Sequence, residues 1–149
     1  MNETASGVTP GYDAVLDVLV EAGQMIEQRM EEAAQAHGLS VAKMGVLHAL
    51  VQKGEPVPLG VLSRELRCVK SNITQLIDRM EVDKLVRRIP DPGDRRSIRA
   101  EITEEGRRRY EEGWQALAQV RQEILAALSE RDREQLLRLV ALIHEGSSG

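Results

Sequence analysis

The segment from Lys70 to about Lys84 carries polar side chains that could bind the edges of nucleic-acid bases. Its apolar residues recur at three- and four-residue spacing, which predicts a helix with the remaining side chains on the opposite face. This outward set comprises Lys70, Ser71, Asn72, Thr74 and Gln75. Gln can bond adenine through two hydrogen bonds, Lys can reach guanine acceptors, and Ser or Thr can contact bases or phosphates. The pattern predicts a DNA-reading helix, and the alternative is an ordinary solvated helix face.

A second basic group lies in Asp91-Pro92-Gly93-Asp94-Arg95-Arg96, between two strand-like stretches. Residues 97–102 alternate between polar and apolar, so that segments 85–90 and 97–102 are expected to form a β-hairpin. Pro followed by Gly is typical of the centre of a type II turn, because Pro presets φ and Gly tolerates positive φ. An Arg at the tip of such a hairpin can enter a narrow minor groove, where the negative potential is enhanced. The alternative is a surface hairpin whose arginines only contribute to solubility.

The other candidate reactive residues do not form a catalytic or metal pattern. Cys68 is the only cysteine, which excludes an intramolecular disulfide, and its apolar turn position favours packing over redox sensing. His37, His48 and His144 lack metal-ligand spacing, so we expect no metal and no cofactor. His48 adjoins the apolar face of its helix, but nothing else supports a role in an effector pocket. Without a nucleophile–base pair or a phosphate-binding Gly-rich loop, we expect no enzyme.

These residues need a helical framework to position them, and the apolar periodicity supplies one. It predicts helices over about 12–37, 41–53, 59–66, 70–84 and 103–128, and a last helix that follows Ser129. Ser40, Thr103 and Ser129 are expected N-caps, the last with Asp132 in a capping box. The two short helices at 59–66 and 70–84, joined by a tight turn, are typical of a helix-turn-helix. Arg67 stands where this turn often holds Gly, and Val69 where Ser or Thr would cap better.

Length and charge fit one domain with an anion-binding middle. The 149 residues suffice for one buried core, and with 2% aromatics that core must be mostly aliphatic. The net charge is −4, but residues 58–109 hold 13 Lys/Arg against 9 Asp/Glu, whereas the remainder holds 7 against 15. This asymmetry favours an anionic partner for the middle segment. No apolar run reaches the length of a membrane span and no signal-peptide plan is visible, so we expect a cytoplasmic protein.

From Leu59 through Gly106 the chain resembles the MarR family of winged helix-turn-helix regulators. The matching stretches are Leu62-Ser63-x-Glu65-Leu66, Asn72-Ile73-Thr74-x-Leu76-Ile77-Asp78-Arg79-Met80-Glu81, Leu85-Val86-Arg87-Arg88, Asp91-Pro92-x-Asp94-Arg95-Arg96 and Ile102-Thr103-x-x-Gly106. The resemblance implies that Arg96 is the minor-groove probe and that a salt bridge from Asp94 steadies it. Arg87, Arg88 and Arg99 would then contact phosphates. The full expected DNA-binding set is Lys70, Ser71, Asn72, Thr74, Gln75, Arg79, Arg87, Arg88, Asp94, Arg95 and Arg96.

The resemblance also implies a mainly α fold with a β-hairpin wing, organised as a single domain over 1–149. About 57–103 would form the winged lobe, while about 11–53 and 104–144 would supply dimerisation and effector helices. The apolar stripes of those terminal segments exceed what one small core would hide, which favours a homodimer; the alternative is a larger intramolecular core. The expected function is a regulator, in the first place a repressor, that binds palindromic operators and is released by a small-molecule effector. The alternative function is a winged helix that assembles with proteins and does not bind DNA.

Overall fold

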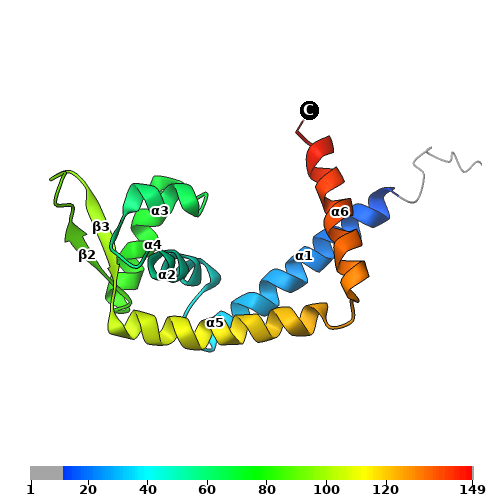
Figure 1. Cartoon of the computed structure of the whole chain (residues 1–149), viewed down its shortest axis with the longest axis horizontal. Coiled ribbons are helices and arrows are strands. Elements are labelled where there is room, and N and C mark those ends of the chain that lie inside the picture. Colours follow the sequence, from blue (N-terminus) through cyan, green and yellow to red (C-terminus); the bar gives the residue numbers. More distant parts are fainter. Residues whose placement is uncertain (1–11, 149) are drawn as a thin grey trace, which may run out of the picture.

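The computed structural model describes residues 12–148, with side chains from residue 14 onward; the predicted single domain begins and ends beyond these bounds. The described chain is mainly helical, with one small sheet (Figure 1). Its elements are α1 (Tyr12–Gln35), α2 (Val41–Lys53), β1 (Val57–Pro58), α3 (Leu59–Glu65), α4 (Lys70–Val82), β2 (Val86–Pro90), β3 (Ile98–Ile102), α5 (Glu104–Leu125) and α6 (Glu130–Gly146). The predicted fold class, helices with a hairpin wing, is confirmed.

Three helices begin where the sequence supplies a side-chain cap. The Ser40 side chain accepts a hydrogen bond from the Lys43 N–H, and Thr103 accepts one from the Gly106 N–H. Ser129 and Asp132 form the reciprocal bonds of a capping box at the start of α6. Each cap satisfies an N–H that has no partner inside its own helix. These local signals are why the predicted helix starts are confirmed.

A compact lobe is built from α2, α3, α4 and the sheet, at one end of the molecule (Figure 1). Its largest fully buried side chains are aliphatic, as the composition requires: Val46, Leu47, Leu50, Leu62, Ile73, Ile77, Met80, Leu85 and Val86. They come from every helix of the lobe and from the start of β2, so each element covers another one. The lobe therefore buries its apolar faces within one chain.

The sheet has the order β1-β3-β2, and both pairings are antiparallel. β2 and β3 form the predicted hairpin, with Val86 opposite Ile102 and Pro90 opposite Ile98. β1 was not predicted, because a two-residue strand has no period to detect. Val57 pairs with Ala100, and both residues are buried, so β1 closes the inner edge of the wing onto the core.

Four predicted helix ends lie too far along the chain. α1 ends at Gln35 instead of His37, and α3 at Glu65 instead of Leu66. α4 ends at Val82, because Lys84 adopts a left-handed backbone (φ 60°) and turns the chain into β2. α5 ends at Leu125 instead of Leu128, where the Arg133 guanidinium of the next helix donates to the Leu125 carbonyl (2.9 Å). That bond supplies a partner for one of the carbonyls that every helix C-terminus leaves open.

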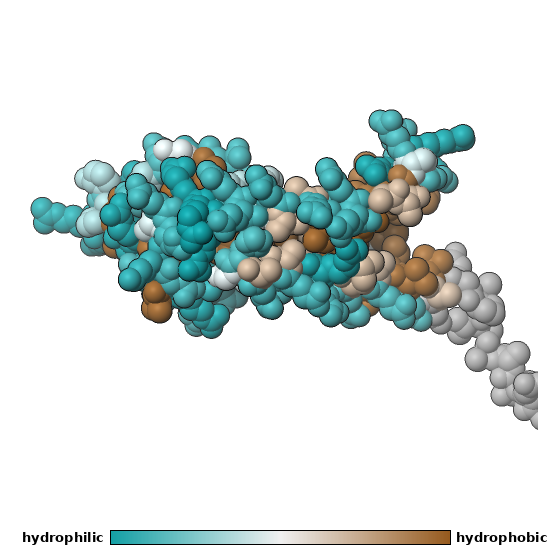
Figure 2. Space-filling model, turned by 90° about the horizontal axis from the view of Figure 1, so that it is seen from below, coloured by the Kyte–Doolittle hydropathy of each residue, from teal (hydrophilic) through white to brown (hydrophobic). Residues whose placement is uncertain are grey.

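The terminal helices extend away from the lobe and leave much of their apolar surface uncovered. α5 leads from the lobe to α6, with α1 packed against it (Figure 1). α6 has no buried residue, and Val18 and Leu137 are 63% and 72% exposed. Hydrophobic side chains gather at this end of the space-filling view, whereas the lobe is mostly hydrophilic (Figure 2). None of the helices within residues 12–148 is long and apolar enough to cross a membrane.

Candidate nucleic-acid interface

Helix α4 presents its polar residues to solvent, as the sequence predicts. Ile73, Ile77 and Met80 are fully buried in the lobe and fix the rotation of the helix. The opposite face is therefore exposed, and it carries Lys70, Ser71, Asn72, Thr74, Gln75 and Arg79. Apart from Asp78 this face holds only neutral or basic side chains, which suits an approach to the base edges of a duplex.

One residue of this face already has an internal partner. The Thr74 hydroxyl donates to the Lys70 carbonyl (3.0 Å), one helical turn earlier. Its hydroxyl hydrogen is thus used within the helix, and the oxygen remains available as an acceptor. Gln75, the next residue along, is exposed and keeps both amide donors and the amide oxygen for a ligand.

The turn between α3 and α4 is held despite a poorly suited sequence. Arg67 adopts a left-handed backbone (φ 50°), the conformation for which Gly is the usual residue. Val69 provides no side-chain cap for α4. The Ser63 hydroxyl bonds to the Cys68 carbonyl and the Cys68 N–H donates to the Ser63 carbonyl (2.9 Å), so Ser63 ties the turn from both sides. Cys68 is half-buried against the core, which agrees with its expected packing role.

The wing tip differs from the predicted type II turn. Gly93 does not have the positive φ that a type II turn requires, and its N–H donates to the Asp91 side chain (2.8 Å). The tight turn lies further on, where the Ser97 N–H donates to the Asp94 carbonyl (3.0 Å). Arg95 and Arg96 are therefore the central residues of that turn, and both are exposed. Both arginines therefore lie in the exposed loop that joins β2 to β3.

Asp94 holds Arg96 in a different way from the one expected. The predicted salt bridge is wrong: the Asp94 carboxylate accepts the backbone N–H of Arg96 (2.9 Å), and the guanidinium is not its partner. The carboxylate thus fixes the turn and leaves the Arg96 side chain to reach outward. Because an Asp at the first position of a turn commonly bonds two residues ahead, this role was within reach of the sequence.

An ion pair that the sequence analysis missed locks the base of the wing tip. The Arg99 guanidinium donates to the Asp91 carboxylate (2.9 Å), across the mouth of the hairpin. The hydrogen bond from Arg99, aided by the Gly93 N–H, lowers the pKa of the Asp91 carboxyl. The Arg99 guanidinium is thus bound within the wing, and the expected contact from it to a phosphate stays a prediction.

Arg88 links the wing to α4. Its guanidinium donates to Glu81 (2.7 Å) and to the Thr74 carbonyl (3.2 Å), and it pairs with Asp78 (2.5 Å). Burial acts to lower the pKa of Arg88, but the hydrogen bonds that its guanidinium donates to Asp78 and Glu81 outweigh burial and raise it. Arg87, on the other face of β2, pairs with Glu101 of β3. Both arginines are neutralised within the chain, and contacts from them to DNA stay a prediction.

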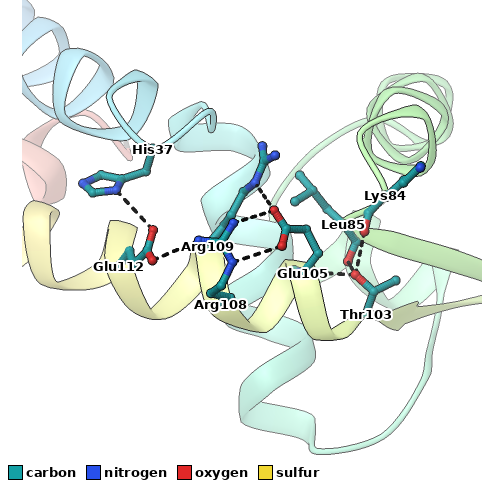
Figure 3. A network of polar contacts seen from close by, with 9 residues as sticks. His37, Lys84, Leu85, Thr103, Glu105, Arg108, Arg109 and Glu112 are labelled. Atoms are coloured by element: carbon teal, nitrogen blue, oxygen red, sulfur yellow. Dashed lines mark hydrogen bonds and ion pairs between the residues drawn. The ribbon is translucent and has the colours of Figure 1, made fainter.

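A network of polar contacts around Thr103 and Glu105 surrounds the start of α5, and Thr103 connects it to the lobe (Figure 3). The Thr103 hydroxyl lies against the carbonyls of Lys84 (2.6 Å) and Leu85 (3.1 Å), where α4 passes into β2. Glu105 accepts from Arg108 (2.7 Å) and Arg109 (2.8 Å), and these bonds lower its pKa to about 2. The start of α5 is therefore joined to the end of the candidate DNA-reading helix.

An aromatic stack joins α2 to α5, and the sequence did not indicate it. The His48 ring lies parallel to Trp114 (ring centroids 4.4 Å apart), and its Nδ1 is 2.9 Å from the Tyr110 hydroxyl. The Arg121 guanidinium covers Trp114 at 5.2 Å. Residues 62 and 66 positions apart in the chain supply the contacts with His48, so local patterns could not reveal them. Among the described residues no group of three His, Cys, Asp or Glu could hold a metal ion.

The fold defined by this lobe is a winged helix-turn-helix, and the comparisons assign it to a family. A family model described as MarR family matches residues 37–97. The chain is 34% identical over 89 residues to the HTH-type transcriptional regulator MhqR of Bacillus subtilis, covering 60% of this chain and 61% of the relative. It is 35% identical over 103 residues to the transcriptional activatory protein BadR of Rhodopseudomonas palustris, covering 68% and 57%. The aligned chain thus spans less than two thirds of these relatives.

Solved structures show the same fold over nearly the whole chain. The MarR family regulator AbsC from Streptomyces coelicolor has a TM-score of 0.83 at 23% identity, covering 95% of this chain and 97% of that one. A mutant MarR from E. coli, complexed with operator DNA, has a TM-score of 0.76 at 20% identity, covering 87% and 93%. At these identities the likeness concerns the fold alone. The family model and the curated relatives show that residues 37–97 are a MarR family segment.

Proposed function

We propose that this chain is a transcriptional regulator that binds palindromic DNA as a homodimer. The observation that carries the proposal is the exposed polar face of α4 beside the exposed turn arginines Arg95 and Arg96. α4 would lie in the major groove with Gln75 on base edges, and the wing would place Arg96 in the adjacent minor groove. The curated relatives MhqR and BadR are named as transcriptional regulators, which supports this class and favours no catalytic activity.

The terminal helices support the dimer. α1 and α6 expose apolar residues that the chain itself does not cover, among them Val18 and Leu137. A second copy packed on these helices would bury them and would set two α4 helices at a fixed separation, as two half-sites require. Release by a small-molecule effector, repression in preference to activation, and a cytoplasmic location follow from the family resemblance and remain part of the proposal.

The experiment that tests DNA binding separates base reading from charge. A duplex selected from random sequence by the wild-type protein is titrated beside a scrambled duplex at several salt concentrations. Gln75→Ala should cost about 1–3 kcal/mol on the selected duplex and relax its preference at one or two positions in each half-site. Arg96→Ala should weaken binding to both duplexes and reduce the salt slope by about one unit per protomer. Asp94→Ala should resemble Arg96→Ala more weakly, because it loosens only the turn.

The alternative function, assembly with a protein, makes the opposite prediction for the wing. If Arg96→Ala bound both duplexes as the wild type does, the wing would not be a DNA probe and the assembly function would gain support. The polar outward face of α4 argues against assembly, since a protein-binding face would be enriched in apolar and aromatic residues at its centre.

A further inference from the structure

A cavity of about 600 Å³ lies between α3, α4 and the wing, on the side of the lobe that carries the candidate DNA interface. Its basic lining residues are Arg64 from α3, Lys70 from α4, and Arg88 and Arg96 from the wing, with Asp94 as the acid. Arg64 belongs to none of the sets that the sequence analysis assigned to DNA. The cavity therefore gathers positive charge from three elements that are separate in the chain.

The charges in this cavity differ in whether they are already neutralised. The nearby acids pair elsewhere: Glu65 with Lys53, Asp78 and Glu81 with Arg88, and Asp91 with Arg99. Within residues 12–148, Arg64, Lys70 and Arg96 consequently have no ion-pair partner. Asp94 uses one carboxylate oxygen to hold the Arg96 N–H. Three uncompensated cations thus face one acid, and the cavity favours an anion.

The geometry of a bound duplex indicates which anion this would be. With α4 in the major groove and the wing in the next minor groove, one sugar–phosphate strand must run between these two elements. That is the position of the cavity, and each phosphate carries one negative charge. On this basis, and resting on the proposed function, we infer that the cavity holds a backbone phosphate and that Arg64 and Lys70 bind it.

The basic residues of the lobe then have different tasks. Arg64 and Lys70 position the strand without reading sequence, since every nucleotide offers the same phosphate. Arg88, which Asp78 and Glu81 already neutralise, forms a wall of the cavity and holds the wing on α4. Arg96 lines the cavity from the wing and keeps the proposed role in the adjacent minor groove. Lys70 thus moves from the base-reading group to the phosphate-binding group.

The test combines charge removal on the protein with charge removal on the DNA. Arg64→Gln is titrated against the selected and the scrambled duplex, and Arg107→Gln is the matched control. Arg107 is an exposed arginine at the start of α5, outside the cavity lining. Arg64→Gln should weaken binding to both duplexes by about tenfold or more, and it should lower the salt slope of the dimer by about two. Lys70→Gln should act in the same direction, and Arg107→Gln should change affinity less than about twofold.

Duplexes with single neutral methylphosphonate linkages then locate the contact. A neutral linkage at one position in each half-site should weaken binding by the wild type. The same linkage should not further weaken binding by Arg64→Gln, which already lacks that contact. Arg64→Lys should retain the wild-type salt slope, because it keeps the charge. Thermal unfolding should be the same for Arg64→Gln and the wild type, since the removed side chain is exposed and has no ion pair.

Three results would overturn the inference. The first is an affinity of Arg64→Gln equal to that of Arg107→Gln on both duplexes. The second is a loss of affinity for the selected duplex alone, which is the behaviour of a base-reading residue. A wild-type protein that binds neither duplex would remove the proposed function together with the phosphate site. The first two results leave the proposed function standing, so that the two failures can be distinguished.

Discussion

Helices α4 and α6 have similar amphipathic sequences, but their apolar faces differ in burial. α4 buries Ile73, Ile77 and Met80 completely, because α3 and the sheet cover its apolar face. α6 is four residues longer, at 17 against 13, yet none of its residues is buried. Leu142, which lies in its last turns, is 54% exposed. The apolar face of α4 is covered within the chain, whereas that of α6 stays exposed to solvent.

The difference shows which part of the molecule the single chain can stabilise. Burial of apolar surface is the main favourable term in folding, and the lobe obtains it from its own elements. The terminal helices would obtain it only on association, so their order and the separation of two lobes would depend on the same contacts. α5 links the two regions: its residues 104–117 include the buried Gly106, Tyr110, Gly113 and Leu117, and most of its last turn is exposed.

The largest expected effect is on association through α6. Ile143→Glu places a charge on the apolar face of α6, where burial against a partner would leave it unpaired. We expect the dimer dissociation constant to rise at least about 30-fold, since two copies are altered and each costs on the order of 1–3 kcal/mol. Sedimentation at several concentrations measures this, and helical circular dichroism of the lobe should persist.

Arg138→Gln is the matched control for this prediction, because it makes the same change in charge on the opposite face of α6. It should leave the dissociation constant within about threefold of wild type. Dimers of Ile143→Glu that are as stable as those of the wild type would show that α6 is not at the interface, and the contrast between α4 and α6 would then need another cause.

The next effect in size concerns the joint between the lobe and α5. A Cβ added at Gly106 would lie 2.2 Å from the Leu85 carbonyl oxygen, which is backbone and also accepts from the Thr103 N–H. Gly106→Ala should therefore force α5 away from the lobe and reduce the free energy of unfolding by about 1–3 kcal/mol. Urea unfolding at fixed protein concentration measures this.

Gly60→Ala in α3 is the control, because no atom lies within 4 Å of the added Cβ. It should leave stability unchanged or raise it by up to about 1 kcal/mol through helix propensity. If Gly106→Ala behaved like Gly60→Ala, the close approach of α5 to Leu85 would not constrain the lobe.

The contrast between local and long-range features explains what the sequence could predict. Helix starts at Ser40, Thr103 and Ser129 were predictable because each cap is decided by neighbours within three residues. The buried and exposed faces of α4 followed from its periodicity for the same reason. Arg88 with Glu81, and the His48–Trp114 stack, depend on how separate elements pack, and no local pattern encodes that packing.

The wing tip is an intermediate case. Pro92-Gly93 predicted the wrong turn because Asp91 binds the Gly93 N–H and Arg99 holds Asp91, so the chain turns three residues later. Arg95 and Arg96 still lie at the tip, although for a different reason from the predicted one. The assignment of individual residues to DNA stays a prediction that the titrations above would test.

The smallest expected effect is a loss of stability at low pH, which can be compared between the two regions. Arg108 and Arg109 lower the pKa of Glu105 to about 2, from an ordinary value of 4.5, by hydrogen bonds to the ionised carboxylate. A carboxyl whose pKa is lower in the folded state stabilises the fold above its unfolded pKa, and this stabilisation is lost as the pH falls from about 4.5 to 2. Glu105→Gln should thus be less stable than the wild type at pH 6, and the two should converge near pH 2. Urea midpoints across this range measure the difference, which should be small because the group is exposed to solvent.

In α6 the Ser129 hydroxyl and N–H lower the pKa of Asp132 in the same direction, so Asp132→Asn should show the same convergence. If α6 is ordered only by association, the Asp132→Asn difference should grow with protein concentration, while the Glu105→Gln difference at the joint to the lobe should depend on it less. Equal concentration dependence for the two variants would contradict the division between a self-sufficient lobe and partner-dependent terminal helices.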